Sequence, residues 1–147
     1  MNDLSHDFEI VVFTASHISY ADAIMNYLDP DKKLFKARLY RDHCVLTEEG
    51  LLIKDLTIFK DRKLENIVLV DNALYSFSFQ IENGIPIIPF YNNSSDMELL
   101  SLRNYLKGLK NVSDVRKTNR KAFKYNMFND IENLNEIANA MFSDKQI

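Results

Sequence analysis

Residues that interrupt secondary structure or cross-link a chain are scarce in this sequence. Its 147 residues include 3 glycines, 3 prolines, no tryptophan and one cysteine, Cys44. So little glycine and proline excludes a collagen-like repeat and argues against a disordered chain. A single cysteine excludes an internal disulfide and favours a reducing compartment. We therefore expect a globular domain that works inside the cell.

Two further features are missing, a long hydrophobic run and an excess of positive charge. No stretch approaches the roughly 20 apolar residues that span a bilayer, and residues 1–7 contain no signal-peptide core. The net charge of −3 leaves no basic footprint for nucleic acid. With 46% hydrophobic residues, the chain can bury the core of one domain. The sequence thus predicts neither a membrane span nor direct nucleic-acid binding.

Apolar, strand-like runs alternate with helical patterns along the chain. The clearest strand is at residues 67–70, and another apolar, β-branched run occupies residues 8–13. Runs of this kind are typical of strands buried on both faces of a parallel sheet. The sequence therefore predicts an α/β fold with strands at 8–13, 35–40, 67–70 and 85–90, a hairpin at 44–53, a helix or tight turn at 73–79, and helices at 20–28, 94–109 and 131–142.

Polar side chains follow two of the expected strands. Thr14 comes directly after residues 8–13, and Asp71 comes directly after residues 67–70. Ligands of parallel sheets bind outside the carboxyl ends of the strands, so we expect both side chains to face one crevice. A carboxylate there suits Mg²⁺, a hydroxyl can hold phosphate oxygens, and Lys54 can neutralise a transferring phosphoryl group. Each residue also has a structural interpretation, as a helix cap, a turn residue and a surface charge.

The remaining reactive side chains show no functional pattern in the sequence. Cys44 lies in an apolar run and is interpreted as a buried packing residue rather than a nucleophile. His17 and His43 are isolated and lack metal-ligand spacing, so they are interpreted as structural or solvent-facing.

Three short motifs occur in a fixed order, F-T-A-S at residues 13–16, I-K-D-L at 53–56 and L-V-D-N at 69–72. Together with the segments around them, they resemble the RNA polymerase II C-terminal-domain (CTD) phosphatases and small CTD phosphatases. These form the NLI-interacting-factor family of the haloacid dehalogenase superfamily. The resemblance covers about residues 8–115. The same domain also occurs in a subunit of the mitochondrial inner-membrane protein translocase, so the resemblance indicates the fold more directly than the biological role.

This resemblance implies a fold, a domain division and an activity. The implied fold is a haloacid-dehalogenase-like, Rossmannoid parallel sheet flanked by helices, with a small β-hairpin insertion. Residues 1–115 would form the phosphatase-like domain, and residues 116–147 would form a basic linker and a C-terminal amphipathic helix. The implied activity is Mg²⁺-dependent hydrolysis of phosphoserine or phosphothreonine in a protein substrate.

Five residues match positions with roles in the family. By this resemblance, Thr14 binds the phosphoryl group, and Lys54 stabilises that group and the aspartyl-phosphate intermediate. Asp71 is implied as the Mg²⁺ ligand, and Asn72 is the neighbouring polar residue assigned to substrate binding. Arg41 is implied to lie near the substrate phosphate.

The sequence departs from the family in one respect. The family's DxDx(T/V) motif, which supplies the nucleophile and the general acid, ends the first and central strand of the sheet. That motif is absent here, so we expect the central strand to be missing between the strands that end near Thr14 and Asp71. Backbone groups left unpaired there would be costly. Either residues 8–13 pair directly with residues 67–70, or another polypeptide inserts a strand between them.

Three hypotheses follow for the function. The first is a protein phosphatase domain whose catalytic N-terminal piece lies elsewhere, with a phosphoprotein substrate and a partner that supplies the missing strand. The second is a pseudophosphatase, an interaction or scaffold subunit of a larger assembly, including a mitochondrial translocase-like role. The third is an unrelated α/β domain. The nucleus or cytoplasm fits the phosphatases, and the mitochondrion fits the translocase relative.

Overall fold

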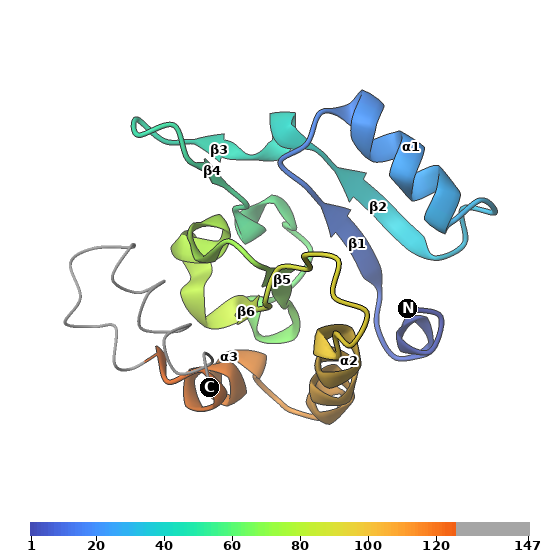
Figure 1. The fold of residues 1–147 in the computed structure, drawn as a ribbon. Coiled ribbons are helices and arrows are strands. Elements are labelled where there is room, and N and C mark those ends of the chain that lie inside the picture. Colours follow the sequence, from blue (N-terminus) through green and yellow to red (C-terminus); the bar gives the residue numbers. More distant parts are fainter. Residues whose placement is uncertain (126–147) are drawn as a thin grey trace.

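The structure is a computed structural model of the chain, and it describes residues 1–125. Within this range no helix is long and apolar enough to cross a membrane. The expected helix at residues 131–142 lies outside the described residues. The described part confirms an α/β fold that contains parallel strand pairs and one antiparallel hairpin (Figure 1).

The first unit of the fold is a strand, a helix and a second parallel strand. Strand β1 (Ile10–Phe13) pairs with β2 (Phe35–Leu39), and helix α1 (Ile18–Leu28) connects them. The turn into β2 depends on Asp29, whose buried carboxylate accepts hydrogen bonds of 2.9 to 3.0 Å from three successive backbone N–H groups, those of Lys33, Leu34 and Phe35.

The hairpin and the second parallel pair follow. Strands β3 (Val45–Leu46) and β4 (Leu52–Ile53) form the expected antiparallel hairpin, and Gly50 in its turn has a φ of 82°, which favours glycine. Strand β5 (Leu69–Asp71) pairs in parallel with β6 (Gly84–Pro86). The 3-10 segment η5 (Leu74–Asn83) connects β5 to β6. The strand expected at 85–90 is short because prolines interrupt it.

The hydrophobic core consists of two clusters around β5 and β6. One contains Leu56, Leu69, Leu74 and Phe77. The other contains Ile85 with residues of helices α2 (Glu98–Leu109) and α3 (Val115–Ala122), and the partly buried Leu4 and Phe8 pack against it. The chain before β1 therefore rests on the same core as β5.

Helix α3 includes residues assigned from the sequence to a basic linker. Its Asn119 is fully buried, donates hydrogen bonds to the carbonyls of Glu82 (2.9 Å) and Gly84 (3.3 Å), and accepts one from the Tyr105 hydroxyl at 2.8 Å. On the outer face, Arg120 forms an ion pair with Glu82. Packing therefore continues past residue 115, while the proposed division of the chain at that point stays a prediction.

The parallel strands do not form one continuous sheet in the described residues. Strand β1 pairs only with β2, and β5 pairs only with β6, so β1 and β5 belong to different sheets. In Figure 1 the strands follow the order β2, β1, β5, β6 across the view, and β1 and β5 stand apart. All four residues of β1 are apolar, yet all are only partly buried. The direct pairing of residues 8–13 with 67–70 considered above is therefore not the arrangement found.

Candidate functional site

The residues singled out from the sequence follow the ends of strands. Thr14 follows β1, Arg41 lies two residues beyond β2, Lys54 follows β4, and Asp71 is the last residue of β5. These positions place them at the carboxyl ends of the two parallel pairs and at the base of the hairpin (Figure 1). They form two groups, one on each parallel pair.

The first group is a buried ion pair between Lys54 and Asp71. Lys54 Nζ contacts Asp71 Oδ2, and the two side chains are only 10% and 9% exposed. The Lys54 backbone N–H donates to the carbonyl of Ser76 at 2.7 Å, and Asp71 Oδ1 accepts from the N–H of Ala73 at 2.8 Å. The interpretation of Lys54 as a solvated surface charge is therefore wrong, because its side chain is buried. A charge buried in this way depends on its partner, because losing either one leaves the other uncompensated.

The second group surrounds the turn between β1 and α1. The Thr14 hydroxyl accepts a hydrogen bond from the N–H of Ser16 at 3.1 Å, so it shapes its own turn. Arg41 lies over that turn, where its Nε donates to the carbonyl of Ala15 at 2.7 Å. Its Nη1 lies 3.3 Å from Nε2 of His17, which must act as the acceptor because arginine only donates. Arg41 is held at one edge while the residue remains exposed.

Cys44 connects the two groups. Its Sγ lies 4.0 Å from the carbonyl oxygens of Thr14 and Tyr40. Burial raises the pKa of the thiol, Lys54 and Arg41 act to lower it, and Asp71 acts to raise it further. One partly buried thiol is thus within electrostatic reach of side chains from both groups, and its role in packing stays a prediction.

The described residues fit a magnesium site in ligand type. The Asp71 carboxylate and the carboxamide of the exposed Asn72 are hard oxygen donors, the kind that Mg²⁺ prefers. Within residues 1–125, however, no group of three or more His, Cys, Asp or Glu side chains is close enough to hold a metal. Asp71 is also engaged by Lys54. Mg²⁺ commonly binds through one or two protein carboxylates and completes its shell with waters and phosphate oxygens, so Asp71 and Asn72 could supply the protein part of such a site.

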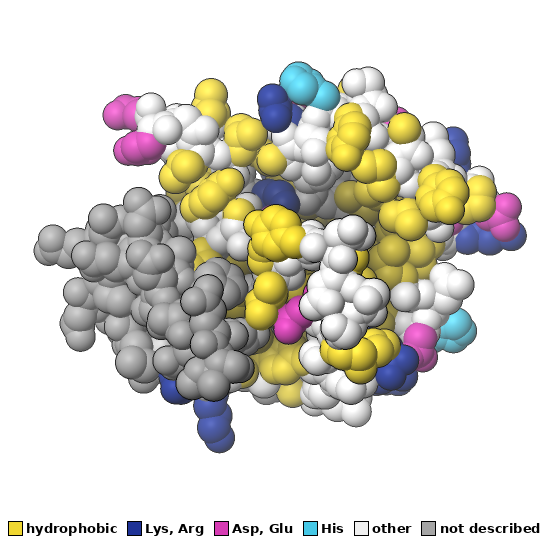
Figure 2. All heavy atoms as spheres, viewed as in Figure 1, with side chains coloured by type: hydrophobic (Ala, Val, Ile, Leu, Met, Phe, Trp, Pro, Cys, Tyr) yellow, Lys and Arg dark blue, Asp and Glu magenta, His cyan; other side chains and the backbone are white. Residues whose placement is uncertain are grey.

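The surface of this face is hollowed between hydrophobic side chains. Figure 2 shows a Lys or Arg side chain deep in the hollow and another at its rim beside a histidine. Among the candidate site residues, Lys54 is 8% exposed and Arg41 is exposed. An anionic group of modest size could therefore meet positive charge both at the rim and at depth.

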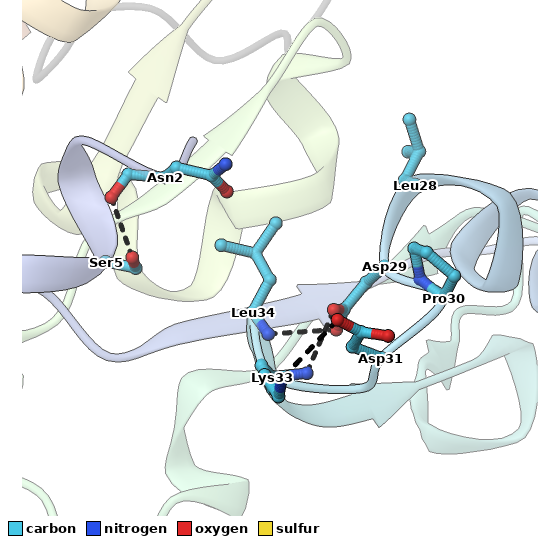
Figure 3. Close-up of a pocket in the computed structure, with 8 residues that line it drawn as sticks. All are labelled: Asn2, Ser5, Leu28, Asp29, Pro30, Asp31, Lys33 and Leu34. Carbon is cyan, nitrogen blue, oxygen red and sulfur yellow. Dashed lines mark hydrogen bonds and ion pairs between the residues drawn. The ribbon is translucent and has the colours of Figure 1, made fainter.

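The cavity drawn in Figure 3 lies elsewhere, at the amino ends of β1 and β2. It measures about 290 Å³ and is lined by residues of the N-terminal segment and the α1–β2 turn, including Asn2, Ser5 and Asp29. The Asp29 carboxylate that faces it is already occupied by backbone N–H groups. This cavity is therefore separate from the site, which lies at the opposite ends of the same strands.

Sequence reasoning missed three residues around the site. His17 contacts Arg41, Tyr40 donates to Asp22 of α1 at 2.5 Å, and Gln80 contacts the two residues after Lys54. These contacts join positions 18 to 25 residues apart. No local pattern in the sequence signals them.

The family model and similar known proteins indicate the same family. Residues 1–116 match the family described as NLI interacting factor-like phosphatase. The chain is 44% identical over 124 residues to CTD small phosphatase-like protein 2 of Dictyostelium discoideum, which covers 84% of this chain and 21% of that protein. It is 40% identical over 116 residues to nuclear envelope morphology protein 1 of Schizosaccharomyces pombe, covering 79% of this chain and 24% of that protein.

A third relative is CTD nuclear envelope phosphatase 1B of Danio rerio, which is 39% identical over 113 residues. That match covers 77% of this chain and 45% of the relative. The chain thus spans less than half the length of each of these three proteins.

Proposed function

The chain belongs to the NLI interacting factor-like phosphatase family, and on that premise we propose that it forms the phosphate-binding part of an Mg²⁺-dependent phosphoserine/phosphothreonine protein phosphatase. The observation that carries this proposal is the buried Lys54–Asp71 pair, and both of its residues, like Arg41, lie within electrostatic reach of Cys44, whose Sγ is 4.0 Å from the Thr14 carbonyl oxygen. A cation and a carboxylate buried together at the end of a parallel strand have a use in phosphoryl transfer.

Each side chain has a distinct part in this proposal. Lys54 neutralises charge on the phosphoryl group, and the free edge of the Arg41 guanidinium binds phosphate oxygens. The hydroxyl of Thr14 holds a further oxygen. Asp71, with Asn72 beside it, would hold Mg²⁺, which when bound neutralises phosphate charge. With phosphate and a metal bound, Lys54 would pair with the phosphate and Asp71 would serve as a ligand, so the two side chains would no longer depend on each other.

A nucleophilic carboxylate must come from outside the described site. In our proposal a strand that carries an aspartate fills the space between β1 and β5. Support comes from the two strands, which each have one unpaired edge, and from the partly exposed apolar residues of β1. A strand parallel to both would end beside Thr14 and Asp71. Each backbone hydrogen bond gained contributes about 0.5–1.5 kcal/mol net, and the addition of a strand to a free sheet edge is an established mode of binding.

Substrate and compartment follow from the same family. We propose a phosphorylated serine or threonine in a protein segment as substrate, because the face in Figure 2 has a hollow that contains a Lys or Arg side chain and is bordered by hydrophobic side chains. Two relatives carry the words "nuclear envelope" in their names. A nuclear or cytoplasmic location therefore suits this chain better than a mitochondrial one.

The experiment adds the strand as a peptide. Because the chain has no tryptophan, a peptide with a DxDx(T/V) motif between apolar residues and one terminal tryptophan reports its own binding by fluorescence. The expected result is hydrolysis of p-nitrophenyl phosphate that needs both the peptide and Mg²⁺. The matched control is the same peptide with both aspartates replaced by asparagine, which should bind without turnover. A peptide that binds but gives no hydrolysis would count against the phosphatase proposal.

A second candidate function is a phosphatase-like interaction subunit without turnover. The observation in its favour is that Lys54 and Asp71 satisfy each other and that no three-ligand cluster is found within residues 1–125. This alternative predicts that a phosphopeptide binds the chain, that Arg41→Ala weakens the binding, and that no phosphate is released even when the strand peptide is bound.

A further inference from the structure

The side chain of Gln80 forms hydrogen bonds with both residues that follow Lys54. Gln80 Oε1 accepts a hydrogen bond from the backbone N–H of Leu56 at 3.0 Å, and Gln80 Nε2 donates one to Asp55 Oδ1 at 2.9 Å. Both ends of a single carboxamide are therefore engaged on consecutive residues. No other side chain among the described residues makes such a two-ended contact with this segment.

The backbone of η5 directs Gln80 toward this segment. Gln80 has non-helical angles, φ −133° and ψ 62°, inside the 3-10 stretch, so the chain bends at this residue. The stretch itself is anchored on both sides of the bend. Phe77 is fully buried, and Asn83 donates to the carbonyls of Leu64 and Ile67 at 2.6 and 2.7 Å.

The same stretch also holds Lys54 from its other side, since the Ser76 carbonyl accepts from the Lys54 backbone N–H at 2.7 Å. Lys54 is therefore fixed before and after its own Cα by one anchored segment. Its side chain is only 10% exposed and its ammonium group contacts Asp71, so the buried four-carbon stem has little room to compensate for a shift of the backbone. A displacement of about 1 Å at such a group can cost about 100-fold in rate.

We infer that Gln80 is a positioning residue for Lys54, which it holds against Asp71 through Asp55 and Leu56. This inference rests on the proposed function only for the consequence in catalysis. The chemistry requires a carboxamide, because one group must accept from an N–H and donate to a carboxylate at the same time. A glutamate of the same shape keeps the acceptor but faces Asp55 with a like charge.

The first test measures access to the Lys54 amine in the chain alone. Dilute acetic anhydride labels each lysine, and mass spectrometry gives the rate at every position. Gln80→Glu should raise the Lys54 rate at least about fivefold, because local opening exposes the amine. Lys107, whose side chain is 45% exposed, should keep its rate.

A swapped pair separates positioning from general loss of stability. In Asp55→Asn/Gln80→Glu the carboxamide and the carboxylate have exchanged places, so the hydrogen bond can form again and Lys54 should regain most of its protection. Asn119→Ala serves as the control, because it destabilises the fold through α3. Equal labelling of Lys54 in Asn119→Ala and Gln80→Glu, or no recovery in the swap, would overturn the inference.

The second test measures turnover with the strand peptide bound. Gln80→Glu should lower kcat at least about tenfold and leave KM within about twofold, because Lys54 acts on the transferring group rather than on substrate affinity. The swap should recover kcat. If the unaltered chain hydrolyses nothing, the proposed function fails while the labelling result still decides the role of Gln80. An unchanged kcat in an active Gln80→Glu protein would contradict the positioning role.

Discussion

Glu9 and Arg62 form an ion pair between the segment that leads into β1 and the segment that leads toward β5, with 2.7 Å between Oε2 and Nη2. Beside it, Phe8 packs with Val68 and Val70 against the core. The two parallel pairs are thus tied together at their amino ends, and at their carboxyl ends Cys44 lies between the two groups of site residues. No backbone hydrogen bonds between β1 and β5 join the β1–β2 pair to the β5–β6 pair.

The unpaired edge of β1 predicts where a proline substitution would block the binding of the strand peptide. Because Thr14 donates its N–H to Leu39 of β2, alternation along the strand turns the N–H of Val12 toward β2 and that of Val11 toward the free edge. Proline is tolerated where the N–H faces outward and not where it serves a ladder. We expect Val11→Pro to keep the far-ultraviolet circular dichroism of the chain and to abolish binding of the strand peptide.

Val12→Pro is the matched control, since it changes the same residue type one position along. It should unfold the β1–β2 pair in the absence of peptide. If both variants bind the peptide as the unaltered chain does, the strand enters somewhere other than the edge of β1.

The Lys54–Asp71 pair makes a prediction about stability. Removing one partner of a buried ion pair leaves the other charge uncompensated, which costs about 3–5 kcal/mol. We expect Lys54→Met to lower the free energy of unfolding by about this amount in urea titrations. The double variant Lys54→Met/Asp71→Leu should lose clearly less than the sum of the single variants. Additive losses would show that the two charges are already hydrated in the folded chain.

The sequence predicted the elements and the family better than it predicted the site contacts. Periodicity located α1 and α2, and the turn residues around Gly50 located the hairpin, because these signals lie within a few residues of one another. The family, inferred from three ordered motifs, is confirmed. The roles of Thr14, Arg41, Lys54, Asp71 and Asn72 stay predictions. What the sequence could not supply were contacts between distant positions, such as Gln80 with Asp55.

Helix α3 is a second case in which the sequence did not reveal a buried contact. Its many lysines and arginines are typical of a solvated linker, yet the helix contains two buried residues, Val115 and the polar Asn119. Asn119→Ala removes the partner of the Tyr105 hydroxyl and of the Glu82 carbonyl, at about 1–3 kcal/mol for each buried group left unpaired, while the Gly84 carbonyl keeps its hydrogen bond from the Tyr125 hydroxyl at 2.9 Å. We expect a loss of at least about 2 kcal/mol in urea titrations. Lys121→Ala, on the exposed face of the same helix, should change stability by less than about 0.5 kcal/mol.

The hydrogen bonds of Asp29 predict how the stability of the chain changes at acidic pH. Burial acts to raise the pKa of this carboxyl, but hydrogen bonds from the backbone N–H groups of Phe35, Leu34 and Lys33 outweigh it, so the pKa lies below its usual value. A depressed folded pKa means that the stabilisation is complete above the unfolded pKa of about 3.9 and is lost as the pH falls through the folded pKa. Asp29→Asn keeps the shape, accepts with one oxygen and does not titrate. We therefore expect it to be less stable than the unaltered chain at pH 7 and to show a shallower loss of stability as the pH falls below about 4 in thermal unfolding. Parallel pH profiles for the two proteins would show that this carboxylate does not hold the α1–β2 turn.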